Sequence, residues 1–200
     1  MRGKMKTMRS VLVRIAVAGV LLLAGTAAQA APAKPSSHPG FLSLQPFLDL
    51  ASPDDDVTEV NVGPELLQSL SQGMDDPEVR KMLGGLVAVH AVVLGLTGSD
   101  VSSRLDRARR LVADTTKRLT DAGWESIVRV KEKNSAVSVL TRSAGAEGKI
   151  HGLAVLVVET DEDEPQIVFA NIAGTLEMSQ IRRLSSGLHL DLPGLDELGK

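Results

Sequence analysis

Residues 149–160 read KIHGLAVLVVET, and every position from Leu153 to Val158 carries an apolar side chain. Successive side chains of a strand point to opposite faces of a sheet, so both faces of this predicted strand are apolar. Helices can cover one face, but the other face then needs cover from elsewhere. We expect that cover to come from the Phe41–Leu50 segment, from a leucine-containing tail over residues 188–200, or from another protein chain. The candidate interaction surface on this strand consists of Leu153, Val155 and Val157.

This strand is one of four predicted strands that follow one another after Gly123, with short turns between them. Consecutive strands joined by short connections pair in an antiparallel manner, so the four strands predict a meander. The predicted strands span residues 124–131, 136–142, 149–160 and 165–172.

Upstream of the meander, the pattern alternates between strands and helices. Residues 57–62 predict a strand, and two short helices are predicted to begin at Pro64 and Pro77, because proline suits the first turn of a helix. Asp76 is the predicted N-cap of the second helix. The valine-rich run 86–96 predicts a strand that is buried on both faces.

Two further helices complete the pattern. A long amphipathic helix is predicted from Ser99 or Asp100 to Gly123, and a last helix is predicted over residues 177–186. The fold class predicted by this order is α+β. We expect a mainly antiparallel sheet of five to six strands, with helices packed largely on one face.

The first thirty residues have the features of a secretory signal peptide. Five basic residues are followed by the apolar run Ile15–Ala24, and Ala28-Gln29-Ala30 supplies a small-x-small cleavage site. A helix of that run is about 15 Å long, roughly half of a bilayer core. We therefore expect an exported protein, periplasmic or secreted, that begins near Ala31 and keeps no transmembrane anchor.

The chain divides into four expected parts. Residues 1–30 form the signal peptide, 31–56 a Pro/Ser-rich tether and apolar flap, 57–187 a single α+β domain, and 188–200 the leucine-containing tail.

Composition narrows the classes of function. Loss of the five basic leader residues lowers the formal net charge from −3 to −8, which disfavours nucleic acid as a partner. The chain has no cysteine, so a disulfide, a thiolate metal site and a cysteine nucleophile are excluded. With three Phe, one Trp and no Tyr, it has few rings on which a sugar or base could stack.

The motifs around the long helix and the meander resemble those of the bacterial domain of unknown function 4252 family. Asp121-Ala122-Gly123-Trp124-Glu125 is followed by Val128-Arg129-Val130-Lys131, and later come LAVLVV at 153–158 and IVFANIAG at 167–174. The resemblance covers about Val57 to Leu188. It implies an exported α+β domain. That family has no established biochemical activity, so the resemblance implies no catalytic residues.

Two histidines are candidate metal ligands. His90 and His151 lie within apolar predicted strands, and two imidazoles with a carboxylate would suit zinc. No local His-x-x-x-His spacing supports such a site, and a histidine held by hydrogen bonds within the sheet is the alternative. We expect no cofactor.

Charged clusters have ordinary structural interpretations. Asp54–Asp56 and Asp161–Glu164 are interpreted as solvated turns, since neither has the spaced ligands and turn glycine of a calcium loop. The long helix carries a group of basic residues that we interpret as a solvated face, with an acidic partner as the alternative. These residues are Arg104, Arg107, Arg109, Arg110, Lys117 and Arg118.

No catalytic motif is found in the sequence. The Gly-x-Ser-x-Gly elbow of α/β-hydrolases, the P-loop and the dinucleotide fingerprint are all missing. We expect an exported bacterial envelope protein that acts as a non-catalytic binding or protein-interaction module. Its partner would be another envelope protein or a second copy of the same chain. The alternative is a small metal- or ligand-binding protein, or a hydrolase whose site is not visible in the sequence.

Overall fold

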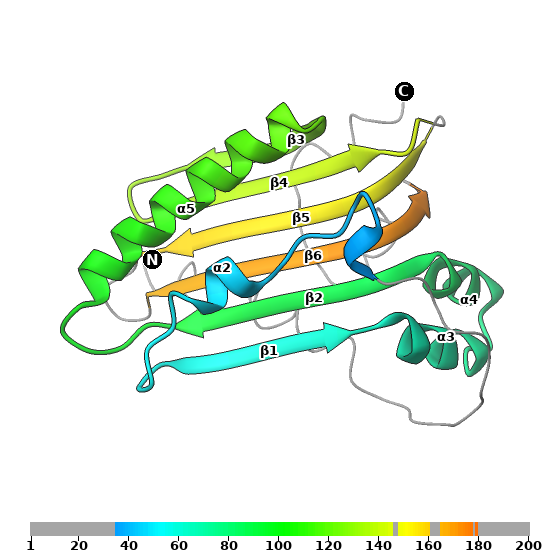
Figure 1. Ribbon diagram of the computed structural model, residues 1–200, viewed down its shortest axis with the longest axis horizontal. Coiled ribbons are helices and arrows are strands. Elements are labelled where there is room, and N and C mark those ends of the chain that lie inside the picture. The colour runs from blue at the N-terminus through cyan, green and yellow to red at the C-terminus, as the bar shows by residue number, and fades with distance from the viewer. Residues whose placement is uncertain (1–34, 146–147, 161–164, 178, 180–200) are drawn as a thin grey trace, which may run out of the picture.

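The structure is a computed structural model that describes residues 35–145, 148–160, 165–177 and 179. Six strands form one antiparallel sheet in the order β1-β2-β6-β5-β4-β3 (Figure 1). The sheet therefore contains the predicted meander β3–β6, and its last strand also pairs with β2. The strands are β1 (Asp56–Val62), β2 (Leu86–Gly95), β3 (Trp124–Lys131), β4 (Ser135–Ser143), β5 (Lys149–Glu159) and β6 (Gln166–Glu177).

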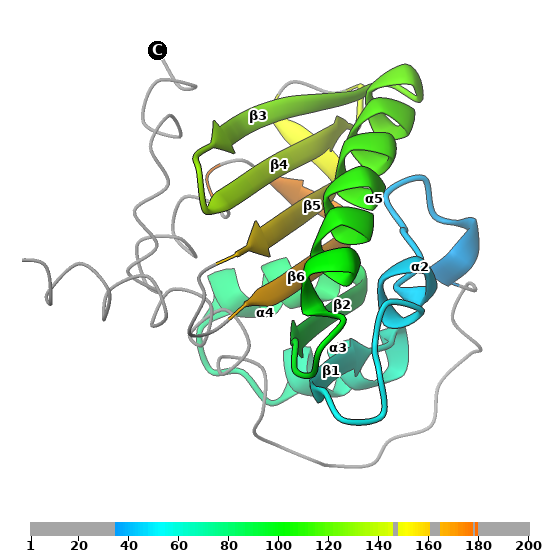
Figure 2. The same ribbon diagram turned by 90° about the vertical axis from the view of Figure 1, so that its left-hand side faces the viewer.

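The helices lie on one face of this sheet and near one of its ends. The long helix α5 (Val101–Asp121) and the short helix α2 (Gln45–Leu48) cover the same face (Figure 2). Helices α3 (Pro64–Gln72) and α4 (Pro77–Gly84) lie between β1 and β2 in the chain, near one end of the sheet, and η1 (Pro35–Ser37) is a single 3-10 turn. The α+β class and its antiparallel sheet are confirmed.

Local sequence signals account for the helix boundaries. Pro64 and Pro77 occupy the first turns of α3 and α4, and the Asp76 carboxylate accepts hydrogen bonds from the amides of Glu78 and Val79. These interactions satisfy amide groups that would otherwise lack partners at a helix N-terminus. After α5, Gly123 adopts a φ of +86°, which favours glycine and turns the chain into β3.

The main core lies between the sheet and the pair α5 and α2. Leu105, Ala108 and Val112 of α5 are buried there, in agreement with the predicted amphipathic helix. Phe47 of α2 stacks on Phe169 of β6 with ring centroids 4.4 Å apart. The Phe41–Leu50 segment is therefore part of the core on the α5 side.

Two sequence predictions need correction. Strand β2 is not buried on both faces, because its residues alternate between buried and half-buried along its length. Strand β6 continues to Glu177, five residues beyond the predicted end at 172, because it pairs with β5 as far as Lys149. The predicted helix over 177–186 begins at Glu177, which is in this strand. Ser179 is helical, as predicted, and the other positions of that helix lie outside the described residues.

Other expectations also fall outside the described part of the chain. These are the signal peptide 1–30, the acidic run Asp161–Glu164 and the tail 188–200. Within the described residues, no helix has both the length and the apolar character needed to cross a membrane.

Candidate functional site

The sheet face opposite α5 carries a broad aliphatic surface. Paired residues of an antiparallel sheet point to the same face, so the strand register shows which side chains adjoin. One row runs Val130, Val137, Val157, Val168, Val93 from β3 to β2, and a second runs Val128, Val139, Val155, Ala170, Ala91. A third row contains Leu153, Ile172 and Val89. We call these thirteen residues the valine face.

The valine face is uniform in its chemistry. Within these rows the described strands β2, β6, β5 and β4 contribute no charged and no aromatic side chain. Val139, Val157 and Val168 are buried, while most of their neighbours are half-buried. At one end the surface is bounded by polar groups, where the Gln166 amide donates to the Glu159 carboxylate at 2.6 Å. A contiguous aliphatic surface with a polar border is typical of interaction sites.

The opposite end of the valine face is closed by α4. Met82 and Leu86 pack there against Ile150 and Leu176, which form a small second core. Leu153 and Ile172 extend this cluster onto the valine face. Thus α4 reaches the end of the valine face at Ile150 and Leu176, while α5 and α2 lie on the other face of the sheet (Figure 2).

The three residues selected from the sequence lie together on this surface. Leu153, Val155 and Val157 occupy β5, a middle strand of the sheet, and are flanked by β4 and β6. The Phe41–Leu50 segment packs on the opposite face, so it does not cover them. The sequence suggested three possible covers for the second face of the sheet. The Phe41–Leu50 segment is excluded by this observation, which leaves the tail over residues 188–200 or another chain.

The opposite sheet face, which we call the helix face, carries both candidate histidines. His90 lies on β2 and His151 on β5, with β6 between these strands. Each has a different aromatic neighbour: Phe41 lies edge-on to His90 at 5.0 Å, and His38 lies edge-on to His151 at 5.3 Å. The structure therefore does not bring the predicted pair together. Among the described residues, no group of three or more His, Cys, Asp or Glu could hold a metal ion.

Burial changes the titration of two histidines. Desolvation lowers the pKa of His90, and the Glu59 carboxylate opposes this shift only in part. Desolvation also lowers the pKa of His38, and the nearby His151 imidazole lowers it further. Both shifts favour the neutral imidazole in the folded protein.

A buried amide attaches the N-terminal segment to the helix face. Asn171 of β6 is 1% exposed; its Oδ1 accepts from the Leu42 amide at 2.9 Å, and its Nδ2 donates to the carbonyl oxygens of Gly40 and Leu153. Gly40 lies directly on Gly152, so a Cβ on Gly152 would approach the Gly40 Cα to 2.7 Å. The sequence signal for this contact was the polar Asn171 within the apolar strand IVFANIAG.

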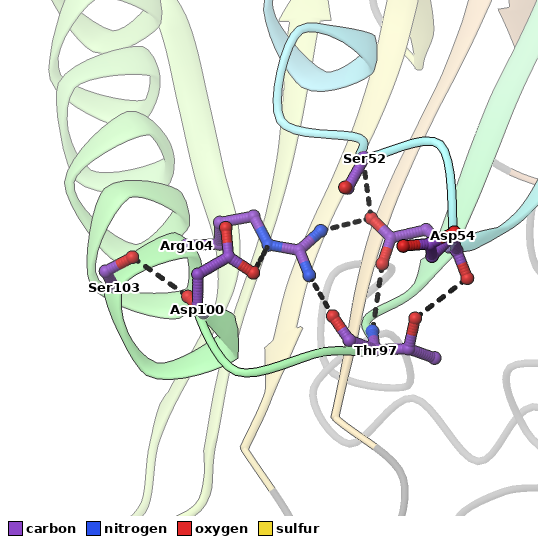
Figure 3. A network of polar contacts seen from close by, with 7 residues as sticks. Ser52, Asp54, Thr97, Asp100, Ser103 and Arg104 are labelled. Carbon is purple, nitrogen blue, oxygen red and sulfur yellow. Dashed lines mark hydrogen bonds and ion pairs between the residues drawn. The ribbon is translucent and has the colours of Figure 1, made fainter.

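A buried ion pair fixes the start of α5. Arg104, predicted to lie on a solvated helix face, is only 3% exposed, and the Asp55 side chain is fully buried. The Arg104 guanidinium donates to the Asp55 carboxylate and to the Thr97 carbonyl, and its Nε forms an ion pair with Asp100 at 3.1 Å (Figure 3). The interpretation of these two residues as a solvated face and a solvated turn was wrong.

The same network determines the charge of Asp55. Burial alone would raise the pKa of Asp55, but hydrogen bonds from the Thr97 and Ser52 amides and from Arg104 outweigh it and hold the pKa below its ordinary value. The ionised carboxylate joins three chain segments, namely the loop before β1, the loop after β2 and the first turn of α5. This network is structural, since its hydrogen bonds and ion pairs join these segments of the chain to one another.

Together these features define the class of the chain: a single-sheet α+β protein with one face packed against α5 and α2 and one aliphatic face. The chain belongs to the family described as domain of unknown function (DUF4252), whose model matches residues 52–184. No curated protein matches it. Among solved structures, the Ran-binding protein Mog1p of Saccharomyces cerevisiae is similar at 14% identity and a TM-score of 0.29, with 78% of this chain and 77% of that chain covered. That similarity carries no functional argument.

Proposed function

We propose that this protein is a non-catalytic interaction module of the bacterial cell envelope that binds a partner protein through the valine face. The observation that supports the proposal is the continuous aliphatic surface across the middle strands of the sheet, opposite α5. Such a surface releases water when it is covered by another apolar surface, which favours association.

The chemistry of the surface restricts the partner. Its side chains are valine, alanine, leucine and isoleucine, with no charged group in the two rows through Val155 and Val157 within the described strands. A partner that fits would present an aliphatic segment, since a charged group placed there would lose its water without gaining an ion pair. The polar border at Glu159 and Gln166 would contact the polar rim of that segment.

Export is the second part of the proposal. The basic leader, the short apolar run and Ala28-Gln29-Ala30 support cleavage near Ala31 and a location in the periplasm or the medium. Intact mass measurement of the protein recovered from the periplasm and from the medium tests this part. A species that begins near Ala31 is expected in one of the two, and an uncleaved chain retained in the cytoplasm would contradict it.

Site-specific photo-crosslinking in living cells tests the interaction. A photoreactive residue at Val155 is expected to give one discrete adduct with a different envelope protein. The matched control is Arg107, an exposed position of α5 on the opposite side of the sheet, where no such adduct is expected. Equal adducts at both positions, or none at Val155, would contradict the proposal, and an adduct of twice the chain mass would indicate self-association instead.

A further inference from the structure

We propose that acidification releases the start of the N-terminal segment from the sheet, because a pair of histidines holds residues 36–40 on β5 only while both rings are neutral. The contact consists of His38 and Gly40 on the segment and of His151 and Gly152 on β5, and we call these four residues the histidine clasp. The clasp belongs to the helix face and contains no residue of the valine face, so this inference is independent of the proposed function.

Two backbones meet in the clasp without room for a side chain. A Cβ on Gly40 would overlap the His151 carbonyl group, and a Cβ on Gly152 would come within 2.8 Å of the Gly40 carbonyl oxygen. That same oxygen accepts a hydrogen bond from Asn171 at 3.0 Å. The position of Gly40 therefore decides whether this part of the segment stays on the sheet.

His38 holds Gly40 in this position through an interaction that only the neutral imidazole can make. Its Nδ1 accepts a hydrogen bond from the Gly40 amide at 3.2 Å, within a turn in which the Phe41 amide donates to the His38 carbonyl at 2.9 Å. An imidazolium carries a proton on both ring nitrogens and therefore offers no acceptor. Protonation of His38 would place two N–H donors against each other and break the bond to Gly40.

The second histidine opposes protonation from the side of β5. The His151 ring lies edge-on to the His38 ring with centroids 5.3 Å apart, and its buried Nδ1 has no hydrogen-bond partner among the described residues. In a protonated His151 this nitrogen would be a buried donor without an acceptor. Two imidazolium rings at this distance would also repel each other, so charge on either ring weakens the clasp.

The elements packed around the clasp do not compensate a positive charge. Desolvation lowers the pKa of His38, the His151 imidazole lowers it further, and no carboxylate of the described residues opposes these two effects. On β4 the residue opposite Gly152 is the cation Arg142, and on β6 the neighbouring group is the uncharged amide of Asn171. Because the pKa of His38 is lower in the folded chain, the clasp is complete above pH 6.5 and is lost as the pH falls through the folded pKa.

The release ends before Leu42, because the rest of the segment is held by contacts that do not titrate. The Leu42 amide donates to the Asn171 side-chain oxygen at 2.9 Å, and the Phe47 ring stacks on Phe169 in the main core. Neither contact involves an ionisable group. Acidification therefore detaches the residues before Leu42 and leaves α2 in place.

Amide hydrogen exchange in the full chain, measured by NMR and corrected for the intrinsic effect of pH, tests the clasp. Between about pH 7.5 and about pH 5, protection of the Gly40 amide is expected to fall about fivefold or more, while that of the Leu42 amide is unchanged. The fall should follow the titration of the His38 imidazole, observed through its ring protons. This range lies above the ordinary pKa of 3.8 for Asp55, so the ion pair at the start of α5 stays intact.

Three variants separate the titration of His38 from its structural role. In His38→Asn the side-chain oxygen can still accept from the amide two residues ahead but does not titrate, so protection of Gly40 is expected to be independent of pH. His38→Ala is expected to lose this protection at both pH values. His90→Gln is expected to keep the response, since His90 lies against Phe41 and beside the Glu59 carboxylate, outside the clasp. Circular dichroism of each variant establishes that the sheet is folded.

Several results would overturn the inference. Equal protection of Gly40 at both pH values in the unsubstituted chain would show that the clasp does not open, and an equal fall in His38→Asn would show that another group titrates. Loss of the response in His90→Gln would assign it to the other histidine. A joint loss of protection at Gly40 and Leu42 would show that the whole segment detaches. No partner is needed, so failure here is distinguishable from failure of photo-crosslinking in cells.

Discussion

The two faces of the sheet differ in the size of their side chains and in the contacts that those side chains make. The helix face combines large side chains such as Phe169 and Leu156 with the buried amide of Asn171, which is hydrogen-bonded to the N-terminal segment. The valine face consists of small and branched aliphatic residues that make no directional contact. Buried hydrogen bonds help to fix one packing arrangement on the helix face, whereas aliphatic side chains supply apolar area with few orientational demands.

The ion pair that fixes α5 gives the largest expected effect and tests whether the closed side depends on polar contacts. Arg104→Met leaves the Asp55 carboxylate buried without its cation, and we expect the free energy of unfolding to fall by about 3–5 kcal/mol in urea denaturation. Arg109→Met is the matched control, because Arg109 forms an exposed pair with Asp106, and it is expected to cost at most about 1 kcal/mol. Similar losses in both variants would show that the buried Arg104 pair contributes no more to stability than the exposed Arg109 pair.

Adjacent residues of β5 compare the two faces directly. Leu156 is completely buried on the helix face, and Leu156→Ala is expected to lower the free energy of unfolding by about 2–5 kcal/mol because it leaves a cavity. Val155 is half-buried on the valine face, and Val155→Ala is expected to cost about 1 kcal/mol or less. Equal costs, measured under identical denaturation conditions, would show that the valine face is as tightly packed as the core.

The buried amide tests the attachment of the N-terminal segment. Asn171→Leu removes hydrogen bonds to Leu42, Gly40 and Leu153, and we expect a loss of about 1–3 kcal/mol from backbone groups that are left unpaired. Hydrogen exchange should then increase at Leu42 while α3 stays protected. Asn61→Ser, at an exposed position of β1, serves as the control, and an equal response there would argue against a specific attachment.

The pH dependence of stability is the smallest expected effect and belongs to the helix face. The pKa of His90 is lower in the folded than in the unfolded chain, so its contribution to stability is complete above pH 6.5 and is lost as the pH falls through the folded pKa. In His90→Gln, the free energy of unfolding is expected to fall less as the pH is lowered from 7. The rate at which a Val155→Cys thiolate is alkylated, corrected for thiol ionisation, should show no matching change, since the valine rows contain no titratable group within the described strands.

Asp55 gives a separate signal at lower pH. Its depressed pKa means that its contribution is present above the ordinary value of 3.8 and is lost as the pH falls through the folded pKa. Arg104→Met should remove part of this dependence, because the guanidinium is one of the groups that stabilise the carboxylate. If the free energy of unfolding of Arg104→Met fell at low pH as steeply as that of the unsubstituted protein, the assignment of this pH dependence to the Asp55–Arg104 pair would be contradicted.

Local signals in the sequence predicted most elements. Pro64, Asp76, Pro77 and Gly123 marked helix boundaries correctly, because a cap or a proline acts through the few residues beside it. The valine rows were predicted only in part, through Leu153, Val155 and Val157, since the residues beside them come from strands distant in the chain. The predicted His90–His151 site had no comparable local signal, and β6 separates the two strands.

The sequence by itself determined the α+β class, the meander and the presence of an aliphatic second face, because hydrophobic periodicity and turn residues are local properties. Only the tertiary structure decided that β6 pairs with both β2 and β5, that the Phe41–Leu50 segment lies with α5, and that Arg104 and Asp55 are buried together. Each of these results depends on contacts between segments far apart in the chain. Such contacts are selected by the packing of the whole sheet and leave little trace in a local pattern.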